Sequence, residues 1–274
     1  MEAYSILMSV YHKENPEFFA QALQSMMDQT VMTNDFVLVC DGPLTDALDA
    51  VIESFEKRYP GIFQVVRLEK NVGIGAAANI GLGYCKNELV AKMDADDISV
   101  IDRCECQLKK FQENPELTVL GGYIDEFDVN PETPFACRQV PCEHKQIYKF
   151  ARRRQPFNNM TVMYRRSAVL AVDGYHSLRR CEDYDLYVRL LSAGYYTENL
   201  PKVLVKARVG QGGISRRASK DTLQGIITSR RNAVRMGFSS WLDFAICVGG
   251  ELVFMICPDG LKRFIYNRFL RKKS

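Results

Sequence analysis

The sequence lacks the features of a secreted or membrane-spanning protein. Residues 1–10 carry Glu2 and no basic leader, so a first strand is predicted there rather than a secretory signal. The nine cysteines are scattered and odd in number, without a paired CxxC motif. This pattern argues against a disulfide framework and a zinc site, and favours free thiols in a reducing cytosol. The apolar stretch 242–257 contains Asp243 and Glu251 and falls short of the ~20 apolar residues that cross a bilayer.

A strong net charge is also absent. The formal net charge is +3, which gives no reason to expect a nucleic-acid partner. The last thirteen residues nevertheless hold six lysines and arginines and no acid. Basic and aromatic residues alternate at helical spacing over residues 261–270. This predicts a helix that lies on an anionic membrane leaflet, with packing of the tail on the protein itself as the alternative.

Apolar runs alternate with helical patterns through the first hundred residues. Strands are predicted at 4–10, 36–40, 63–68 and 89–93, with helices at 16–29, 45–59, 74–84 and up to Phe111. This alternation predicts an α/β fold, in which helices flank a mainly parallel sheet. Beyond residue 121 the alternation weakens. Further strands are predicted at 119–127 and 160–164, and helices at 184–192, 218–236, 241–257 and 259–270.

Two of the predicted strands end in carboxylates. Asp41 follows the second strand, Asp94-Ala95-Asp96-Asp97 follows the fourth, and the first strand ends at residues 9–11. Ligand sites in such sheets lie at the carboxyl ends of the strands, so the three ends are expected to meet in one crevice. Clustered carboxylates repel each other, which indicates a hard divalent cation, Mg²⁺ or Mn²⁺, bound together with substrate phosphates. A simple turn at Asp41, and a helix cap by Asp97 or Ser99, are the alternatives.

Three other polar segments are candidates for the site. Residues 71–75 form a glycine-bearing bend into a helix whose N–H groups can face a phosphate or ribose, although the Rossmann glycine spacing is absent. Glu182-Asp183 precedes a predicted helix, and Asp183 is interpreted as a general base for an attacking hydroxyl or as a helix N-cap. The basic run 152–154 indicates a solvated helix end or a contact with acceptor phosphates.

Six segments in order carry a family resemblance. They are SVYHKENPEFFAQALQSMMDQT, VLVCDGPLTDAL, RLEKNVGIGAAANIGL, LVAKMDADDIS, PFNNMTVMYRRSAVLAVDGY and CEDYDLYVRLLSAGY. Over roughly residues 4–208 the chain resembles the family 2 glycosyltransferases of GT-A fold, in the branch that builds bacterial exopolysaccharide, capsule or lipopolysaccharide. The resemblance implies a catalytic domain over 1–210 and a helical extension over 211–274.

The resemblance also implies roles for individual residues. Asp41 would read the base, usually uracil, among residues that line or shape the nucleotide site: Ser9, Val10, Tyr11, Asn71, Gly73 and Asn79. Asp94 and Asp96 match the DxD motif, in which the first acid touches ribose or metal and the second holds the metal against the diphosphate. Asp183 matches the catalytic base, with Glu182 beside it on the acceptor side.

Acceptor contacts are expected from Asn158, Thr161 and Arg154. The chain departs from the family pattern at Asn159, where histidine is frequent, and at Lys92, where this branch often has arginine. A loop over the donor is expected near Arg208 and residues 216–217.

The implied reaction is a single inverting displacement. A hexose would move from a UDP-sugar to a polyprenyl-diphosphate-linked saccharide. The enzyme would be cytoplasmic and peripheral on the inner face of the plasma membrane, and homo-oligomerisation stays open. A nucleotidyltransferase is one alternative, although the first strand end lacks that class's glycine-rich basic signature. A non-catalytic module that binds sugar or a lipid carrier is the other.

Overall fold

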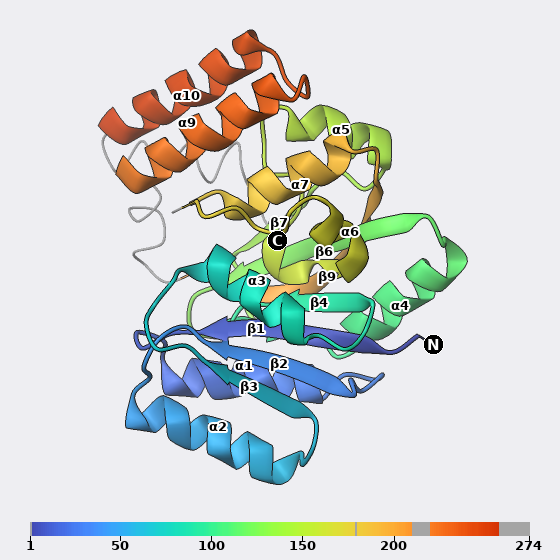
Figure 1. Ribbon diagram of the computed structural model, residues 1–274, viewed down its shortest axis with the longest axis vertical. Helices are drawn as coiled ribbons and strands as arrows, with labels where there is room; N and C mark the ends of the chain where they lie inside the picture. The colour runs from blue at the N-terminus through green and yellow to red at the C-terminus, as the bar shows by residue number, and fades with distance from the viewer. Residues whose placement is uncertain (1, 179, 210–219, 258–274) are drawn as a thin grey trace.

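The computed structural model describes residues 2–178, 180–209 and 220–257. One mixed sheet of nine strands lies at its centre, with helices on its faces (Figure 1), in the order β3-β2-β1-β4-β8-β6-β9-β5, and β7 pairs with β6. The strands are β1 (Tyr4–Val10), β2 (Asp35–Cys40), β3 (Phe63–Arg67), β4 (Leu89–Met93), β5 (Ile98–Ser99), β6 (Leu117–Phe127), β7 (Ala136–Arg138), β8 (Met163–Arg165) and β9 (Tyr196–Arg208). The helices are α1 (Pro16–Met27), α2 (Asp46–Arg58), α3 (Ile74–Tyr84), α4 (Arg103–Glu113), α5 (His144–Ala151), α6 (Arg166–Ala171), α7 (Glu182–Ser192), α9 (Lys220–Arg235) and α10 (Trp241–Ile256).

The first half of the sheet is parallel, as predicted. Strand β1 pairs in parallel with β2 and β4, and β2 pairs in parallel with β3. Every residue of β2 is buried, which explains why its sequence is a continuous apolar run. The carboxyl ends of β1, β2 and β4 therefore lie at one edge, where they position residues 9–11, 41 and 94–97.

The second half of the sheet adds short antiparallel pairings, but its longest pairing is parallel, so the prediction of an α/β fold with a mainly parallel sheet is confirmed. Strand β8 runs antiparallel to both β4 and β6, whereas β6 and β9 are parallel. Strand β9 was not predicted. It contains Pro201, and its register against β6 shifts between Gly122 and Tyr123, where Leu200 and Val203 are the partners. A proline and a bulge interrupt the alternation that identifies a strand in sequence.

Helix α4 carries a buried arginine directly behind the acidic end of β4. Arg103 is 0% exposed, and its Nη2 donates to the carbonyl of Lys92 at 2.7 Å. Its Nε donates to Gln107 Oε1, and Gln107 Nε2 donates to the carbonyls of Leu120 and Thr161 at 2.9 and 2.8 Å. One helix thus ties the end of β4 to β6 and to the 3₁₀ turn Asn159–Thr161.

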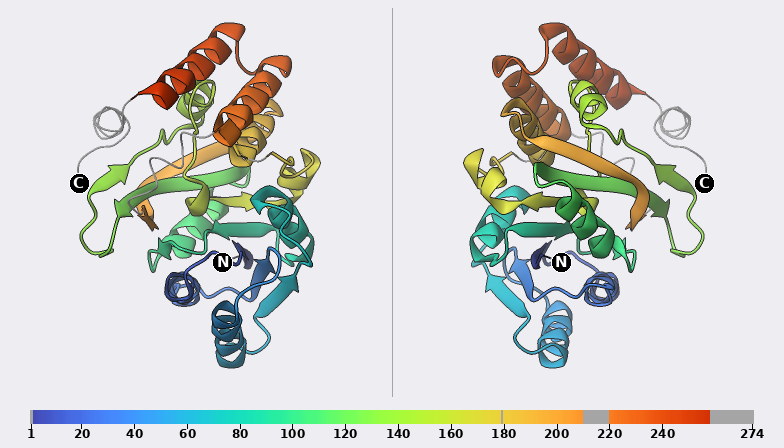
Figure 2. Two further views of the ribbon diagram at one scale, coloured as in Figure 1. Left: turned by 90° about the vertical axis from the view of Figure 1, so that its left-hand side faces the viewer. Right: turned by 90° about the vertical axis from the view of Figure 1, so that its right-hand side faces the viewer.

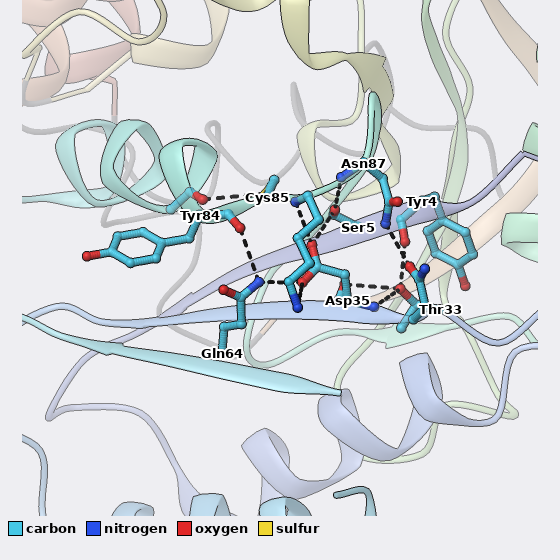
Figure 3. A network of polar contacts seen from close by, with 11 residues as sticks. Tyr4, Ser5, Thr33, Asp35, Gln64, Tyr84, Cys85 and Asn87 are labelled. Atoms are coloured by element: carbon cyan, nitrogen blue, oxygen red, sulfur yellow. Dashed lines mark hydrogen bonds and ion pairs between the residues drawn. The ribbon is translucent and has the colours of Figure 1, made fainter. Parts of the chain in front are cut away.

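A second polar network holds the opposite, amino-terminal ends of the strands together (Figure 3). Asp35 is fully buried and accepts from Ser5 Oγ at 2.5 Å, from the Lys86 backbone N–H at 2.9 Å, and from Gln64 Nε2. These bonds link β1, β2, β3 and the connection into β4. A buried carboxylate needs such partners to offset its desolvation, so this network serves stability at the end remote from the candidate site.

Helices α9 and α10 form an outer layer over α7 and α5 (Figure 2). The Arg230 guanidinium of α9 lies 3.7 Å from the centre of the Tyr184 ring. On α10, Asp243 is 2% exposed and accepts from Arg152 Nη2 at 2.8 Å and from Arg153 Nε at 2.6 Å. Although burial by itself raises the pKa of Asp243, hydrogen bonds from the Ser240 backbone and from Arg153 hold that pKa well below its usual range.

Replacing Asp243 by asparagine is therefore expected to lower the free energy of unfolding at neutral pH by about 1–3 kcal/mol, toward the low end because both arginines remain half-exposed. Because the folded-state pKa is depressed, the carboxylate's contribution is present above its unfolded pKa of about 3.9 and is lost as the pH falls through the folded value. Urea denaturation at neutral and acid pH measures both effects. The variant should lose its deficit in acid, whereas Glu53→Gln, at an exposed carboxylate, should match the parent protein throughout.

Candidate active site

The carboxyl ends of β1, β2 and β4 enclose a cavity of about 480 Å³. Eight of the nine residues predicted to bind nucleotide or metal line it: Ser9, Val10, Tyr11, Asp41, Asn71, Gly73, Asp94 and Asp96. Glu14, Ile74, Lys92, Ala95 and Arg180 complete the lining. The three strand ends that the sequence indicated are therefore assembled around one space.

Asp41 holds the bend that begins α3. It is 5% exposed, and its Oδ1 accepts from the Val72 N–H at 2.7 Å. Its Oδ2 accepts from the Gly73 N–H at 3.1 Å and from Asn71 Nδ2 at 2.9 Å. Gly73 has φ +89°, a conformation that favours glycine, and is the N-cap of α3. A carboxylate oxygen accepts about two hydrogen bonds, so Oδ1 keeps a lone pair for a ligand in the cavity.

The stretch 94–97 gathers carboxylates with little compensating charge. Burial, and after it the charges of Asp94 and Glu14, raise the pKa of Asp96 to about 7. Burial also raises the pKa of Glu14, which lines the same cavity. Asp97 is 3% exposed and accepts from the Arg208 N–H at 2.8 Å. Neither Asp97 nor Ser99 caps the next helix, because α4 begins at Arg103 with Asp102 as its N-cap.

The carboxylates of this stretch suit a divalent cation that takes further ligands from a substrate. Within residues 2–178, 180–209 and 220–257, no three histidine, cysteine, aspartate or glutamate side chains are grouped to hold a metal by themselves. Mg²⁺ is typically bound through one or two carboxylates plus substrate phosphates and waters. Asp94 and Asp96 provide that number of protein ligands. After burial, the charges of Asp94 and Glu14 also raise the pKa of Asp96, and a cation would offset these charges.

Arg208 anchors the backbone of this acidic stretch. Its guanidinium lies between the rings of Phe18 and Phe127, 3.8 and 4.7 Å from their centres. Its Nε donates to the Asp96 carbonyl at 3.2 Å. The end of β9 is thereby joined to the end of β4. Residues 216–217, which were expected near the donor with Arg208, lie outside the described residues.

Lys92 stands between the two acidic pairs of the site. Its side chain is 4% exposed, and its Nζ lies 3.4 Å from Asp94 Oδ1. Burial, then the charge of Asp183, raises the pKa of Glu182 to about 7, and the charge of Lys92 acts in the opposite direction. Sequence reasoning noted Lys92 only as a departure from a frequent arginine. Its position in a buried strand, two residues before the acidic stretch, was the available signal.

Asp183 lies in the first turn of α7 and is not its N-cap, which is Cys181. Its Oδ1 accepts from the Tyr184 N–H at 2.7 Å, and its Oδ2 accepts from Gln155 Nε2 at 2.6 Å. Burial raises the pKa of Asp183, and these two hydrogen bonds lower it. Glu182 and Asp183 do not line the cavity, but a Cβ placed on Gly75 would lie 3.3 Å from Glu182 Cβ. The pair therefore sits against the first turn of α3, beside the cavity.

Gln155 was not among the site residues predicted from the sequence. Its sequence environment, a polar stretch before Pro156, carried no periodic signal. In the structure it orients the Asp183 carboxylate and leaves the second lone pair of Oδ2 free.

Besides Glu182 and Asp183, four other predicted site residues do not line the cavity. Asn79 binds the backbone of Tyr175, accepting from its N–H at 2.7 Å and donating to its carbonyl at 2.6 Å. Asn158 and Thr161 are 0% exposed and hydrogen-bond to the backbone of Gly122. Arg154 is exposed, with its guanidinium 5.5 Å from the centre of the Phe150 ring. Asn79, Asn158 and Thr161 therefore brace the segments around the site through backbone hydrogen bonds, and their contact with a ligand stays a prediction.

Comparison with known proteins agrees with this geometry. The family model for Glycosyl transferase family 2 matches residues 5–178. An uncharacterised glycosyltransferase of Haemophilus influenzae is 40% identical over 98% of this chain and 99% of its own length. The amylovoran biosynthesis glycosyltransferase AmsE of Erwinia amylovora is 37% identical over 97% of this chain and 98% of its own. An Escherichia coli UDP-Gal:alpha-D-GlcNAc-diphosphoundecaprenol beta-1,3-galactosyltransferase is 32% identical over 98% and 97%.

Solved structures show the same fold at low sequence identity. Staphylococcus aureus TarS has a TM-score of 0.64 at 17% identity, covering 97% of this chain and 46% of TarS, so this chain spans about half of that protein. The mannosyltransferase PcManGT of Pyrobaculum calidifontis, solved with GDP-Man and Mn²⁺, has a TM-score of 0.66 at 14% identity, covering 93% of this chain and 70% of its own. The strand-end cavity, the full-length relatives and the shared fold lead to one conclusion: the chain belongs to the family 2 glycosyltransferases and has the GT-A fold.

Proposed function

We propose that this glycosyltransferase moves a hexose, with inversion, from a UDP-sugar to a saccharide carried on polyprenyl diphosphate during surface polysaccharide synthesis. The observation that carries the proposal is that Asp41, the bend at 71–73 and Asp94–Asp96 meet in one strand-end cavity, with Asp183 just beyond Lys92. The names of AmsE and of the Escherichia coli galactosyltransferase support the lipid-linked acceptor and the polysaccharide product. TarS structures with UDP and UDP-GlcNAc support a uridine donor.

Asp41 selects uracil in this proposal. The free lone pair on its Oδ1 accepts from the imide N–H of uracil, whereas the equivalent nitrogen of cytosine carries no proton. The N–H groups of Val72 and Gly73 already hold the carboxylate in place. The N-terminus of α3 lies beside it and favours the negative charge of the diphosphate.

Asp96 and Asp94 would hold Mg²⁺ or Mn²⁺ against the diphosphate. When bound, the cation stabilises the negative charge that develops on the departing UDP. The chain's own contribution is to keep both carboxylates at the cavity, through Arg208 at the Asp96 carbonyl and Lys92 at Asp94.

Asp183 is the proposed general base. Its carboxylate, oriented by Gln155, takes the proton of the acceptor hydroxyl. The hydroxyl oxygen bonds to the anomeric carbon, and the bond from that carbon to the diphosphate oxygen breaks on the opposite face, which releases UDP. Glu182 stands on the acceptor side, and the exposed Arg154 is available to acceptor phosphates.

We further propose that residues 1–210 form the catalytic domain and that residues 211–274 form the helical extension. The enzyme works on the cytoplasmic side of the plasma membrane, where a polyprenyl-linked acceptor is accessible. Homo-oligomerisation is left open.

A panel of nucleotide sugars, supplied with Mn²⁺ or Mg²⁺ and scored for the released product, tests the proposal. We expect UDP release from a UDP-hexose, stimulated by a lipid-linked saccharide and abolished by a chelator. The matched CDP-sugar should give little product, because cytosine carries no proton at the nitrogen that faces Asp41 in this proposal. Pyrophosphate as the product would instead indicate nucleotidyl transfer, and binding without any product would indicate a carrier module.

A further inference from the structure

Helix α10 has an apolar stripe on its outward side. Five large apolar side chains on it are 45% to 65% exposed: Trp241, Leu242, Ile246, Leu252 and Val253. At about 3.6 residues per turn, these positions fall on one side of the helix. Single exposed apolar residues are ordinary, but a stripe along an entire helix indicates a surface that is covered in use.

The charged residues of α10 lie on its other side. Asp243 is bonded to Arg152 and Arg153, and one turn later Cys247 Sγ donates to the Arg153 carbonyl at 3.4 Å. Glu251, two turns after Asp243, has a pKa that burial raises. The helix is therefore fixed to the protein by its polar side, and the outward stripe carries no charged residue.

Positive charge lies close to the first turn of α10. Arg152 and Arg153 follow α5 and pair with Asp243 in that turn, and their side chains are still 43% and 50% exposed. Arg154 beside them is exposed as well. The sequence that follows α10 holds six lysines and arginines in its last thirteen residues. A second copy of the chain laid against α10 would bring these basic groups toward their own counterparts, a repulsive arrangement. An anionic lipid surface attracts them instead.

We propose that α10 docks flat on an anionic lipid bilayer, with its apolar stripe at the level of the acyl–headgroup boundary and residues 152–154 on lipid phosphates. No helix in the described part of the chain is long and apolar enough to cross a membrane, so α10 lies in the interface. The inference rests on the proposed function in one respect, that the acceptor is carried in such a bilayer. Because α10 packs on α9 and α9 packs on α7, docking holds the helix of Asp183 on the membrane side of the molecule (Figure 2).

The chain contains its own probe of this surface, because Trp241 is the single tryptophan and lies in the stripe. With the full chain and phosphatidylglycerol vesicles, we expect the tryptophan emission to shift to the blue and to be quenched by lipids brominated in their acyl chains. Phosphatidylcholine vesicles should give a much smaller change. A chain that co-floats with anionic vesicles while its tryptophan stays accessible to aqueous iodide would overturn the proposal, as would failure to bind them.

A pair of substitutions tests the stripe directly. Leu242→Gln with Ile246→Gln should weaken binding to phosphatidylglycerol vesicles about tenfold or more, given the apolar area that is withdrawn. The matched control is Leu170→Gln with Ile101→Gln, two residues that are 49% and 62% exposed elsewhere, and it should bind like the parent protein.

Three other results would contradict the docking of α10. They are unchanged vesicle binding of the stripe variant, a dimer that dissociates with the substitutions, and a melting temperature that falls as for a buried site. The last two would mean that a second copy or the chain's own tail covers the stripe. UDP release measured without vesicles should be unaffected by the stripe substitutions, so failure of the lipid surface remains distinct from failure of the transferase assignment.

Discussion

Replacing Asp183 by asparagine is expected to lower the turnover number about 10²–10⁴-fold, the usual contribution of a general base. Asparagine keeps the shape of the side chain and can still hydrogen-bond to Gln155 after the amide of either residue turns. Asp183 lies outside the donor cavity, so the affinity for UDP should change less than twofold. Single-turnover UDP release, together with calorimetric titration of UDP, separates the two quantities.

The pH dependence of the parent enzyme follows from the same carboxylate. Burial raises the pKa of Asp183 above its ordinary value. The base acts only when it is unprotonated, so activity should be lost as the pH falls through this raised pKa, earlier than for an exposed aspartate. Asp183→Asn should flatten that acidic limb. If UDP affinity collapses together with turnover, Asp183 binds the donor and the base lies elsewhere.

Gln155→Leu is an informative companion to Asp183→Asn. It removes the hydrogen bond to Asp183 Oδ2 but leaves the carboxylate in place. The loss of turnover should be smaller than for Asp183→Asn, and the acidic limb of the profile should move to higher pH, because a bond that stabilised the charged form is gone. A purely structural role for Gln155 would lower activity without moving that limb.

The parallel half of the sheet could be predicted from the sequence because its signals are local. The run FVLVC is buried on both faces as β2, and Pro16 marks the first turn of α1. Strand ends in a parallel sheet share one edge by geometry, so the placement of Asp41 near Asp94 and Asp96 followed from order along the chain alone. These predictions relied on hydrophobic periodicity, on the length of apolar runs and on sheet topology.

The rest of the site depends on contacts between segments that are distant in the sequence, and the hydrophobic periodicity of a single segment does not reveal such contacts. Arg103 reads in sequence as an ordinary helical arginine, yet it is fully buried and donates to the end of β4. Asn158 and Thr161 stand in a polar segment that suggested acceptor contacts, but both are buried and satisfy the backbone of Gly122. A polar side chain that braces a loop and one that binds a ligand have the same sequence signature. Only the direction of the side chain separates them.

Replacing Asp96 by asparagine is expected to change catalysis and stability in opposite directions. Removing one group that stabilises developing negative charge typically costs about 10²–10³ in turnover. The concentration of Mn²⁺ needed for half-maximal activity should also rise, because a neutral amide binds a hard cation less strongly than a carboxylate. Metal titrations of UDP release measure both effects. The same Mn²⁺ dependence and the same turnover number for the variant and the parent protein would contradict the role of Asp96.

The effect of the same substitution on stability is expected in the metal-free protein. There, burial and the charges of Asp94 and Glu14 raise the pKa of Asp96 to about 7. A folded-state pKa above the unfolded value means that folding takes up a proton, so the stability of the metal-free parent falls as the pH rises from about 4 toward 7. Asp96→Asn removes this repulsion and should raise the melting temperature at pH values above 7 by about 2–4 °C for each kcal/mol relieved.

Mn²⁺ together with UDP should restore the advantage of the parent protein, because the cation binds the carboxylate whose charge destabilises the metal-free protein. Glu53→Gln, at an exposed carboxylate on α2, controls for a general charge effect and should alter neither melting temperature nor metal response. A melting temperature of Asp96→Asn at or below that of the metal-free parent would mean that the acidic stretch is already neutralised within the chain and gains no stability from a bound cation.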